Sequence, residues 1–225
     1  MPETAVATLP QLECYELPAF SADKLDVVRA AFAQADGCVM RQAWLTEPEP
    51  DFSPATIRTG WRNDSFLVFA KLEDADIFTR ATAHNQRMWE LGDVLEIFLS
   101  PENSASYVEF HVTPNNMRLQ LRFPDTAMLR RAQAENQFDN LLLTDGVFRS
   151  HAWAEPENKQ WFVLAEIPAA AVCGTNRPLV GMKWRFSFSR YDYIRGRQEP
   201  ILSSTSPHAW PDFHQREEWG TLIFV

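Results

Sequence analysis

The segment Tyr107–Pro124, YVEFHVTPNNMRLQLRFP, contains the clearest secondary-structure signal in the chain. Before its Thr-Pro-Asn-Asn turn, apolar Val108, Phe110 and Val112 alternate with polar residues, and the same period of two continues after the turn. This alternation is typical of half-buried antiparallel strands, and the short turn between them predicts a hairpin. We therefore expect a hairpin with one apolar face on a core and one polar face.

The polar face of this predicted hairpin carries groups suited to ligand binding. Glu109 and His111 come from its first strand, and Arg118, Gln120 and Arg122 come from its second. Pairing of the two strands is expected to place the acid and the imidazole beside the row of Arg and Gln. This polar row is a candidate binding surface.

A second segment, RMWELGDVLEIFLS from Arg87 to Ser100, leads from a Trp through a Gly-Asp turn into a strand that is apolar on both faces. Such a strand is normally buried, yet Glu96 lies in its middle. Two interpretations stay open. Either Glu96 borders a ligand site walled by Trp89, or it is a buried acid paired with an arginine. The candidate arginines are Arg118, Arg122 and Arg190.

Strand-like runs separated by Gly and Pro turns recur along the chain, which indicates an all-β sandwich or barrel. They are GCVMRQAWL (37–45), ATIRTGW (55–61), FLVFAKLED (66–74), FDNLLLT (138–144), GVFRSHAWAEP (146–156), KQWFVLAEIP (159–168), MKWRFSFSRYDY (182–193) and EEWGTLIFV (217–225). Helical spacing predicts short peripheral helices within 21–37, with Ser21 as cap and Gly37 as stop, and within 125–136. We expect residues 1–37 to form an extension packed on one domain that spans 38–225.

The composition of the chain excludes several classes of binding partner and site. The 225-residue chain has a formal net charge of −9, which argues against a nucleic acid partner and against an anionic membrane surface. Its three cysteines, Cys14, Cys38 and Cys173, are far apart and form no C-x-x-C pair, so a disulfide framework and a zinc site are not expected. The sequence carries no pattern that identifies a protein partner.

The N-terminus lacks the basic and apolar regions of a signal peptide, so we expect a cytoplasmic protein, or an extracellular or periplasmic one if the chain is trimmed. The sequence contains no G-x-S-x-G, H-E-x-x-H, Walker A or G-x-G-x-x-G motif. No catalytic residues are therefore assigned, and we expect a binding domain rather than an enzyme.

Two tryptophans are suited to sugar binding, because the C–H face of a sugar ring packs on an aromatic ring. Trp89 follows the polar stretch HNQRM, and Trp210 lies between prolines in SPHAWPDF. Aromatic side chains on loops of a rigid scaffold are better binding candidates than those inside strands. For each tryptophan, a place in the core is the alternative.

From Ser53 onward the chain resembles the family nine carbohydrate-binding modules and their wider DOMON-type sugar- and haem-binding group. The resemblance is carried, in order, by WRNDSFLVFAKLEDADI, RMWELGDVLEIFLSP, YVEFHVTPN, KQWFVLAEIP, MKWRFSFSR and FHQREEWGTLIF. It implies a jelly-roll-like antiparallel β-sandwich and non-catalytic binding of the terminal sugar of a poly- or oligosaccharide.

The resemblance also implies roles for individual residues. Trp89 and Trp210 correspond to the two rings that clamp the sugar, although Trp219 stands where the family usually has Phe. Glu96 corresponds to an acid that holds sugar hydroxyls. The remaining implied ligand-binding positions are Glu109, His111 and Arg118, and binding members have Gln and Arg where this chain has Glu109 and His111.

No cofactor is certain, but Asp74 and Asp76 lie in an acidic stretch that in some members holds structural calcium; a solvated turn is the alternative. The wider group suggests a second function, a haem b-binding electron-transfer domain with Met88 and either His111 or His151 as ligands. A glycoside-cleaving pair formed by Glu96 and Glu109 is a third hypothesis. An interaction domain without sugar binding is a fourth.

Overall fold

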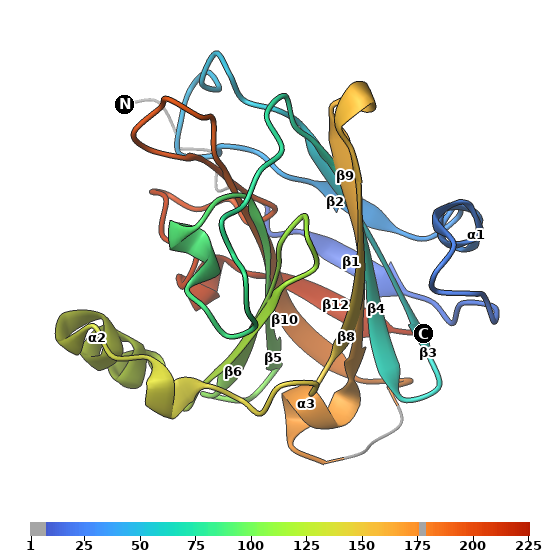
Figure 1. The fold of residues 1–225 in the computed structure, drawn as a ribbon. Coiled ribbons are helices and arrows are strands. Elements are labelled where there is room, and N and C mark those ends of the chain that lie inside the picture. The colour runs from blue at the N-terminus through green and yellow to red at the C-terminus, as the bar shows by residue number, and fades with distance from the viewer. Residues whose placement is uncertain (1–7, 176–178) are drawn as a thin grey trace, which may run out of the picture.

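The computed structural model describes residues 8–175 and 179–225, and strands dominate this part of the chain. Figure 1 shows two sheets packed face to face, with α1 and α2 on opposite sides of the sandwich. The sheets are built from β1 Gln11–Cys14, β2 Gly37–Val39, β3 Ala55–Arg62, β4 Ser65–Glu73, β5 Val94–Pro101, β6 Tyr107–Val112, β7 Arg118–Phe123, β8 Arg149–Glu155, β9 Gln160–Pro168, β10 Lys183–Asp192, β11 Ile201–Ser204 and β12 Gly220–Phe224.

One sheet has seven strands in the order β1-β12-β10-β5-β6-β7, with β11 paired to β10, and the other has five in the order β2-β3-β4-β9-β8. All pairings between these strands are antiparallel except that of β1 with β12. Alternate residues of the inner faces form the central core, including Ile97, Phe110, Val163 and Phe186. The predicted β-sandwich is confirmed.

Both outer faces of the sandwich are covered as well. On the five-stranded sheet, Phe69 and Phe162 pack against Val28 and Phe32 of the N-terminal segment. On the seven-stranded sheet, α2 Thr126–Glu135 and the loops before β5 and β12 cover the outer side chains. This double coverage explains why β5 is apolar on both faces, and it buries every residue of β6.

The N-terminal segment contributes a strand and a helix. β1 extends the seven-stranded sheet, and α1 Leu25–Ala31 lies on the five-stranded one. This helix is shorter than predicted, because the Ser21 hydroxyl bonds to Asp23 instead of capping it, and Gly37 opens β2. None of the helices in residues 8–175 and 179–225 is long and apolar enough to cross a membrane.

The second predicted helix is confirmed as α2. The Asp125 carboxylate caps it by accepting from the Met128 amide at 2.8 Å, and Asn136 ends it in the left-handed conformation. The strand predicted over 138–144 is wrong: this segment forms a short 3₁₀ helix, η2 Asp139–Leu141, with a single bridge from Leu142 to β7. A further short helix, α3 Ala169–Cys173, follows β9 directly.

The register of the β6–β7 hairpin corrects one prediction. Val112 pairs with Arg118, which sets Glu109 opposite Leu121 and His111 opposite Leu119. Paired residues share one face of a sheet, so the Arg and Gln side chains of β7 lie on the other face. A turn one residue longer or shorter reverses this arrangement, and sequence alternation does not specify which occurs.

Candidate functional site

A pocket of about 420 Å³ lies on the outer face of the seven-stranded sheet. Its floor comes from β5, β6, β7 and β10, and its walls come from α2, the 3₁₀ helix η1 Met88–Glu90 and the loop before β12. The lining residues are Arg87, Trp89, Glu90, Glu96, Glu109, Leu121, Phe123, Leu129, Gln133, Asn136, Phe138, Tyr191, Pro211, Asp212, Phe213 and His214. Trp89, Glu96 and Glu109, which the sequence analysis selected, therefore line one cavity.

Trp89 forms part of the pocket wall and is half-buried. Its ring stands edge-on to the rings of His111 and Phe138, with centroids 5.6 Å away in each case. The turn that leads from η1 into β5 requires Gly92: its φ is +140°, and a Cβ there would lie 2.6 Å from the Phe78 carbonyl oxygen. This close approach fixes where η1 presents Trp89.

The pocket floor contains two carboxylates that share one imidazole. His111 Nε2 lies 2.5 Å from Glu109 Oε1 and 3.3 Å from Glu96 Oε1. All three side chains are buried, because the covering segments shield this face of the sheet. The open question about Glu96 is therefore answered in an unexpected way: it is buried and lines the pocket, and the side chain in contact with its carboxyl group is a histidine rather than an arginine.

Burial and mutual attraction distribute the protons in this cluster. Burial raises the pKa of Glu96 to about 8, with Glu109 adding to the rise and His111 opposing it. Burial also opposes the charged forms of Glu109 and His111, but the attraction between these two groups outweighs burial. The attraction lowers the pKa of Glu109 and raises the pKa of His111. The cluster therefore favours an ionised Glu109 paired with the imidazolium form of His111, and a protonated Glu96.

Glu109 retains one free acceptor. Its Oε2 atom is buried without a hydrogen-bond partner among the described residues, and the nearest ionic contact is His214 Nε2 at 3.9 Å. The other ring nitrogen of His214 lies 2.9 Å from the Tyr107 hydroxyl. Burial lowers the pKa of His214, so its imidazole is mainly neutral at pH 7. A buried unpaired acceptor beside a pocket is suited to a ligand donor.

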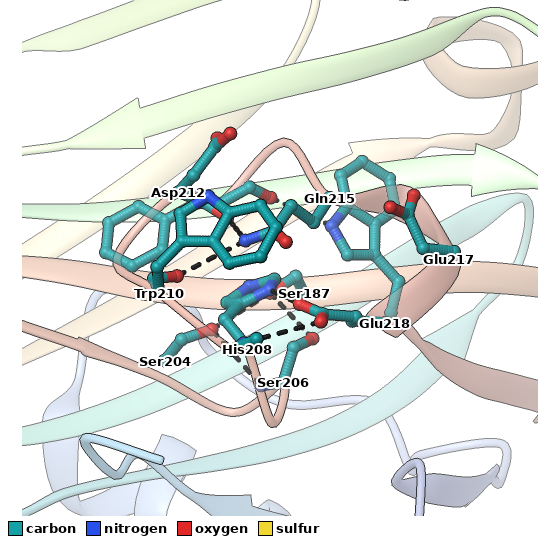
Figure 2. Close-up of polar contacts among 12 residues, drawn as sticks. Ser187, Ser204, Ser206, His208, Trp210, Asp212, Gln215, Glu217 and Glu218 are labelled. Carbon is teal, nitrogen blue, oxygen red and sulfur yellow. Dashed lines mark hydrogen bonds and ion pairs between the residues drawn. The ribbon is translucent and has the colours of Figure 1, made fainter. Parts of the chain in front are cut away.

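Trp210 occupies a separate position at the edge of this region. Its side chain is 58% exposed and does not line the pocket, although residues 211–214, which follow it directly, do. Figure 2 shows the contacts that hold its loop: the Gln215 amide donates to the Trp210 carbonyl at 3.2 Å, and His208 Nδ1 lies 2.8 Å from Glu218 Oε2. These contacts fix the loop while the indole stays open to solvent.

Solved structures of other proteins share this architecture. A candidate carbohydrate-binding protein from Bacteroides uniformis superposes with a TM-score of 0.72 at 19% identity, covering 96% of this chain and 99% of that one. A family nine carbohydrate-binding module from Caldicellulosiruptor kristjanssonii, in complex with cellotriose, gives 0.63 at 13% identity, covering 96% and 93%. The chain has the fold of a family nine carbohydrate-binding module. The resemblance stated from the sequence is confirmed at the level of fold.

Two further comparisons complete this picture. The same Caldicellulosiruptor kristjanssonii module with glucose gives a TM-score of 0.63 at 14% identity, covering 96% of each chain. A protein from Arthroderma benhamiae, described as an extracellular protein, is 26% identical over 181 residues, which is 77% of this chain and 80% of the relative. No protein-family model matches the sequence.

Arg118 does not line the pocket, unlike Glu109 of the same hairpin. Its backbone amide donates to His84 Nδ1 at 3.0 Å, and its guanidinium lies 3.3 Å from His84 Nε2 and 3.7 Å from Asp145. Arg122 likewise faces inward and donates to the carbonyls of Ala171 and Val172 in α3. The hairpin register is the reason, because it places both side chains on the face away from Glu109.

The two predicted calcium ligands, Asp74 and Asp76, contact different arginines. The Asp74 carboxylate binds the buried Arg190 guanidinium at 2.9 Å, whereas Asp76 accepts from the Arg195 amide at 2.7 Å. The carboxylate oxygens of Asp74, Asp93 and Asp192 lie within 4.8 Å of one another, so these three acids, without Asp76, form one group that could hold an ion; Glu96, Glu109 and His111 form another. Calcium binding through Asp74 stays a prediction.

Several lining residues were not identified from the sequence. Asp212 and His214 follow Trp210 in the same loop, and proximity to a selected Trp was the available signal for them. Tyr191 reaches the pocket from β10, beside β5, which no local pattern reveals. The haem ligand pair of Met88 and His151 is not brought together: Met88 is buried on the outer face of the seven-stranded sheet, and His151 lies in β8 of the other sheet.

Proposed function

We propose that this protein is a non-catalytic carbohydrate-binding module that holds the end of a sugar chain in the pocket walled by Trp89. The observation that carries the proposal is the combination of a half-buried Trp wall with buried acceptors on the floor of one cavity. Sugars need an apolar surface for their C–H face and directional polar partners for their hydroxyls. Trp89 supplies the first, and Glu96 and Glu109 supply the second.

The fold adds support, since modules with this fold have been solved with cellotriose and with glucose. A pocket of about 420 Å³ lies within the size range of small-molecule sites. Trp210, at the edge of the pocket, is suited to contact units of the chain that project from it. This differs from the clamp implied by the family resemblance, in which both rings enclose the same sugar.

A binding role is favoured over hydrolysis by the placement of the two acids. Glycosidase carboxylates stand on either side of the bond they cleave. Glu96 and Glu109 instead come from neighbouring strands of one sheet face and converge on the same nitrogen of His111. Both carboxyl groups thus contact one imidazole on the pocket floor, and they do not face each other across the cavity as a glycosidase pair would.

The test is isothermal titration calorimetry with glucose and with gluco-oligosaccharides of increasing length. We expect saturable heat that Trp89→Ala weakens at least about 30-fold, equivalent to about 2 kcal/mol. Trp210→Ala is expected to weaken long ligands more than glucose. Trp153→Ala, which removes a half-buried Trp from the five-stranded sheet, is the matched control and should leave binding unchanged.

An absence of heat with every sugar would refute the proposal. In that case an interaction domain without sugar binding becomes the better account of the fold. Heat that survives Trp89→Ala would place the sugar elsewhere on the protein and would refute the assignment of this pocket.

A further inference from the structure

The acid cluster on the pocket floor has one positive charge too few. Glu96 and Glu109 are both buried, and His111 is the one cationic side chain in close contact with them among the described residues. A buried carboxylate without a cationic partner is costly, so it takes up a proton instead. Glu96 does this, since burial raises its pKa to about 8. The proton on Glu96 thus replaces a missing cation.

Charged groups around the cluster do not supply that cation. Arg87 directs its guanidinium to Asn136, with Nη2 2.6 Å from the Asn136 carbonyl oxygen, and to Glu90 at 3.5 Å. His214 is mainly neutral because burial lowers its pKa. Glu90 and Asp212, which also line the pocket, add further acidic groups. The pocket therefore presents four acidic side chains to a ligand.

Glu109 Oε2 shows where a cation would bind. It is buried, it has no hydrogen-bond partner among the described residues, and its side chain lines the cavity. The 3.9 Å between this oxygen and His214 Nε2 is too long for a direct hydrogen bond, so the oxygen is left able to accept from a ligand donor. Charge-assisted hydrogen bonds to a buried carboxylate are roughly twice as strong as neutral ones.

A metal ion is a weaker candidate for the missing charge. Histidines that bind metals nearly always donate their second ring N–H to a carboxylate, carbonyl or water. His111 Nδ1 has no hydrogen-bond partner among the described residues, and its Nε2 is already in contact with Glu109. Although the ligand atoms of Glu96, Glu109 and His111 lie within 4.8 Å of one another, the imidazole lacks that second partner, whereas an ammonium group needs only carboxylate acceptors.

Resting on the proposed function, we propose that the sugar bound here carries a free primary amine, which binds as an ammonium group against Glu109 and Glu96. The ligand class is an amino sugar or its short oligomer. Entry of the ammonium group allows Glu96 to release its proton to solvent, so charge stays balanced. An N-acetylated sugar lacks the charge and needs more room, and a neutral sugar leaves Glu96 protonated.

The experiment compares three ligands of equal length by calorimetry with EDTA-treated protein at pH 7: glucosamine oligomers, their N-acetylated forms and cello-oligosaccharides. We expect the amine ligand to bind at least about tenfold more tightly than the other two. Titrations in two buffers of different ionisation enthalpy should show release of a proton with the amine and not with the neutral ligands.

Variants test whether the preference for the amine ligand depends on Glu96 and Glu109. Glu109→Gln and Glu96→Gln keep the shape and remove one acid each, and either should reduce amine affinity to that of the neutral sugar. Glu102→Gln removes an exposed acid in the turn after β5 and is the matched control for net charge. Circular dichroism of each variant shows whether a loss of binding reflects unfolding, and two independent variants protect the test if one does not fold.

The outcomes separate the inference from the proposed function. Cello-oligosaccharides that bind as tightly as the amine would overturn the inference and leave the proposed function intact. No binding of any sugar would overturn both. An amine preference that survives both Gln variants, or equals that of the control, would come from the general negative charge of the protein and would also overturn the inference.

Discussion

Glu96 and His111 lie directly opposite each other on β5 and β6, with Glu96 Oε1 3.3 Å from His111 Nε2, and the segments that cover this sheet face bury both. A cross-strand pair of this kind is usually a contact on the surface of a sheet. Here it lies beneath the pocket wall, so its protonation is coupled to folding.

The first prediction concerns the pH dependence of stability. The pKa of Glu96 is about 8 in the folded protein against an ordinary 4.5, so the unfolded chain releases this proton first. The stability that protonated Glu96 contributes is therefore present below about pH 4.5 and is lost as pH rises toward 8. Glu96→Gln, a neutral side chain of similar shape, should make the decline between pH 5 and 8 shallower in urea denaturation.

In the Glu96→Gln variant, stability should still fall somewhat between pH 5 and 8, because other groups also titrate in this range. The pKa of Asp93 is raised to about 8 by burial and by Asp74, and His111 loses its contribution as it deprotonates. Glu102→Gln is the control and should reproduce the wild-type curve. An unchanged slope in Glu96→Gln would show that Glu96 is ionised in the folded protein.

The second prediction concerns His111. His111→Gln leaves Glu109 buried without its imidazole, and removal of one partner from a buried pair typically costs about 3–5 kcal/mol. The double variant His111→Gln/Glu109→Gln should recover much of this loss, because it leaves no unpaired charge. Denaturant midpoints of the wild type, both single variants and the double variant give the coupling energy. Additive losses would contradict the assigned ion pair.

The third prediction concerns Arg190, which is fully buried and binds Asp74 at 2.9 Å and Asp192 at 3.1 Å. Arg190→Met should lower the free energy of unfolding by about 3–5 kcal/mol, since it leaves these acids unpaired. Arg195→Met is the matched control: its side chain is 70% exposed and pairs with Asp76, so a loss below about 1 kcal/mol is expected. Equal losses would contradict the difference in burial.

The fourth prediction tests calcium. Calcium binding at Asp74 predicts a rise in melting temperature on calcium addition, because an ion that binds the folded state stabilises it. The group of Asp74, Asp93 and Asp192 further predicts that Asp192→Asn abolishes this rise and Asp76→Asn keeps it. Identical melting curves in calcium and in EDTA would exclude a structural role for the ion.

Local sequence determined most of the secondary structure. The period of two in β6, β7 and β10 specified strands, because alternate side chains point to opposite faces. The Asp125 cap and Asn136 specified the ends of α2 through local backbone contacts. The segment over 138–144 was mispredicted, because its apolar residues fill the space beside β7 instead of pairing along it.

The candidate site residues also divide into those selected by local sequence and those placed by tertiary structure. Sequence alone selected Trp89, Glu96 and Glu109, because an aromatic residue and acids in such positions are unusual. Tertiary structure decided that these residues meet, that Arg118 lies on the other face and that Trp210 stays outside the pocket. The reason is that strand register and the covering of a sheet face depend on segments distant in sequence, whereas the pattern within a strand reports only which faces can be buried.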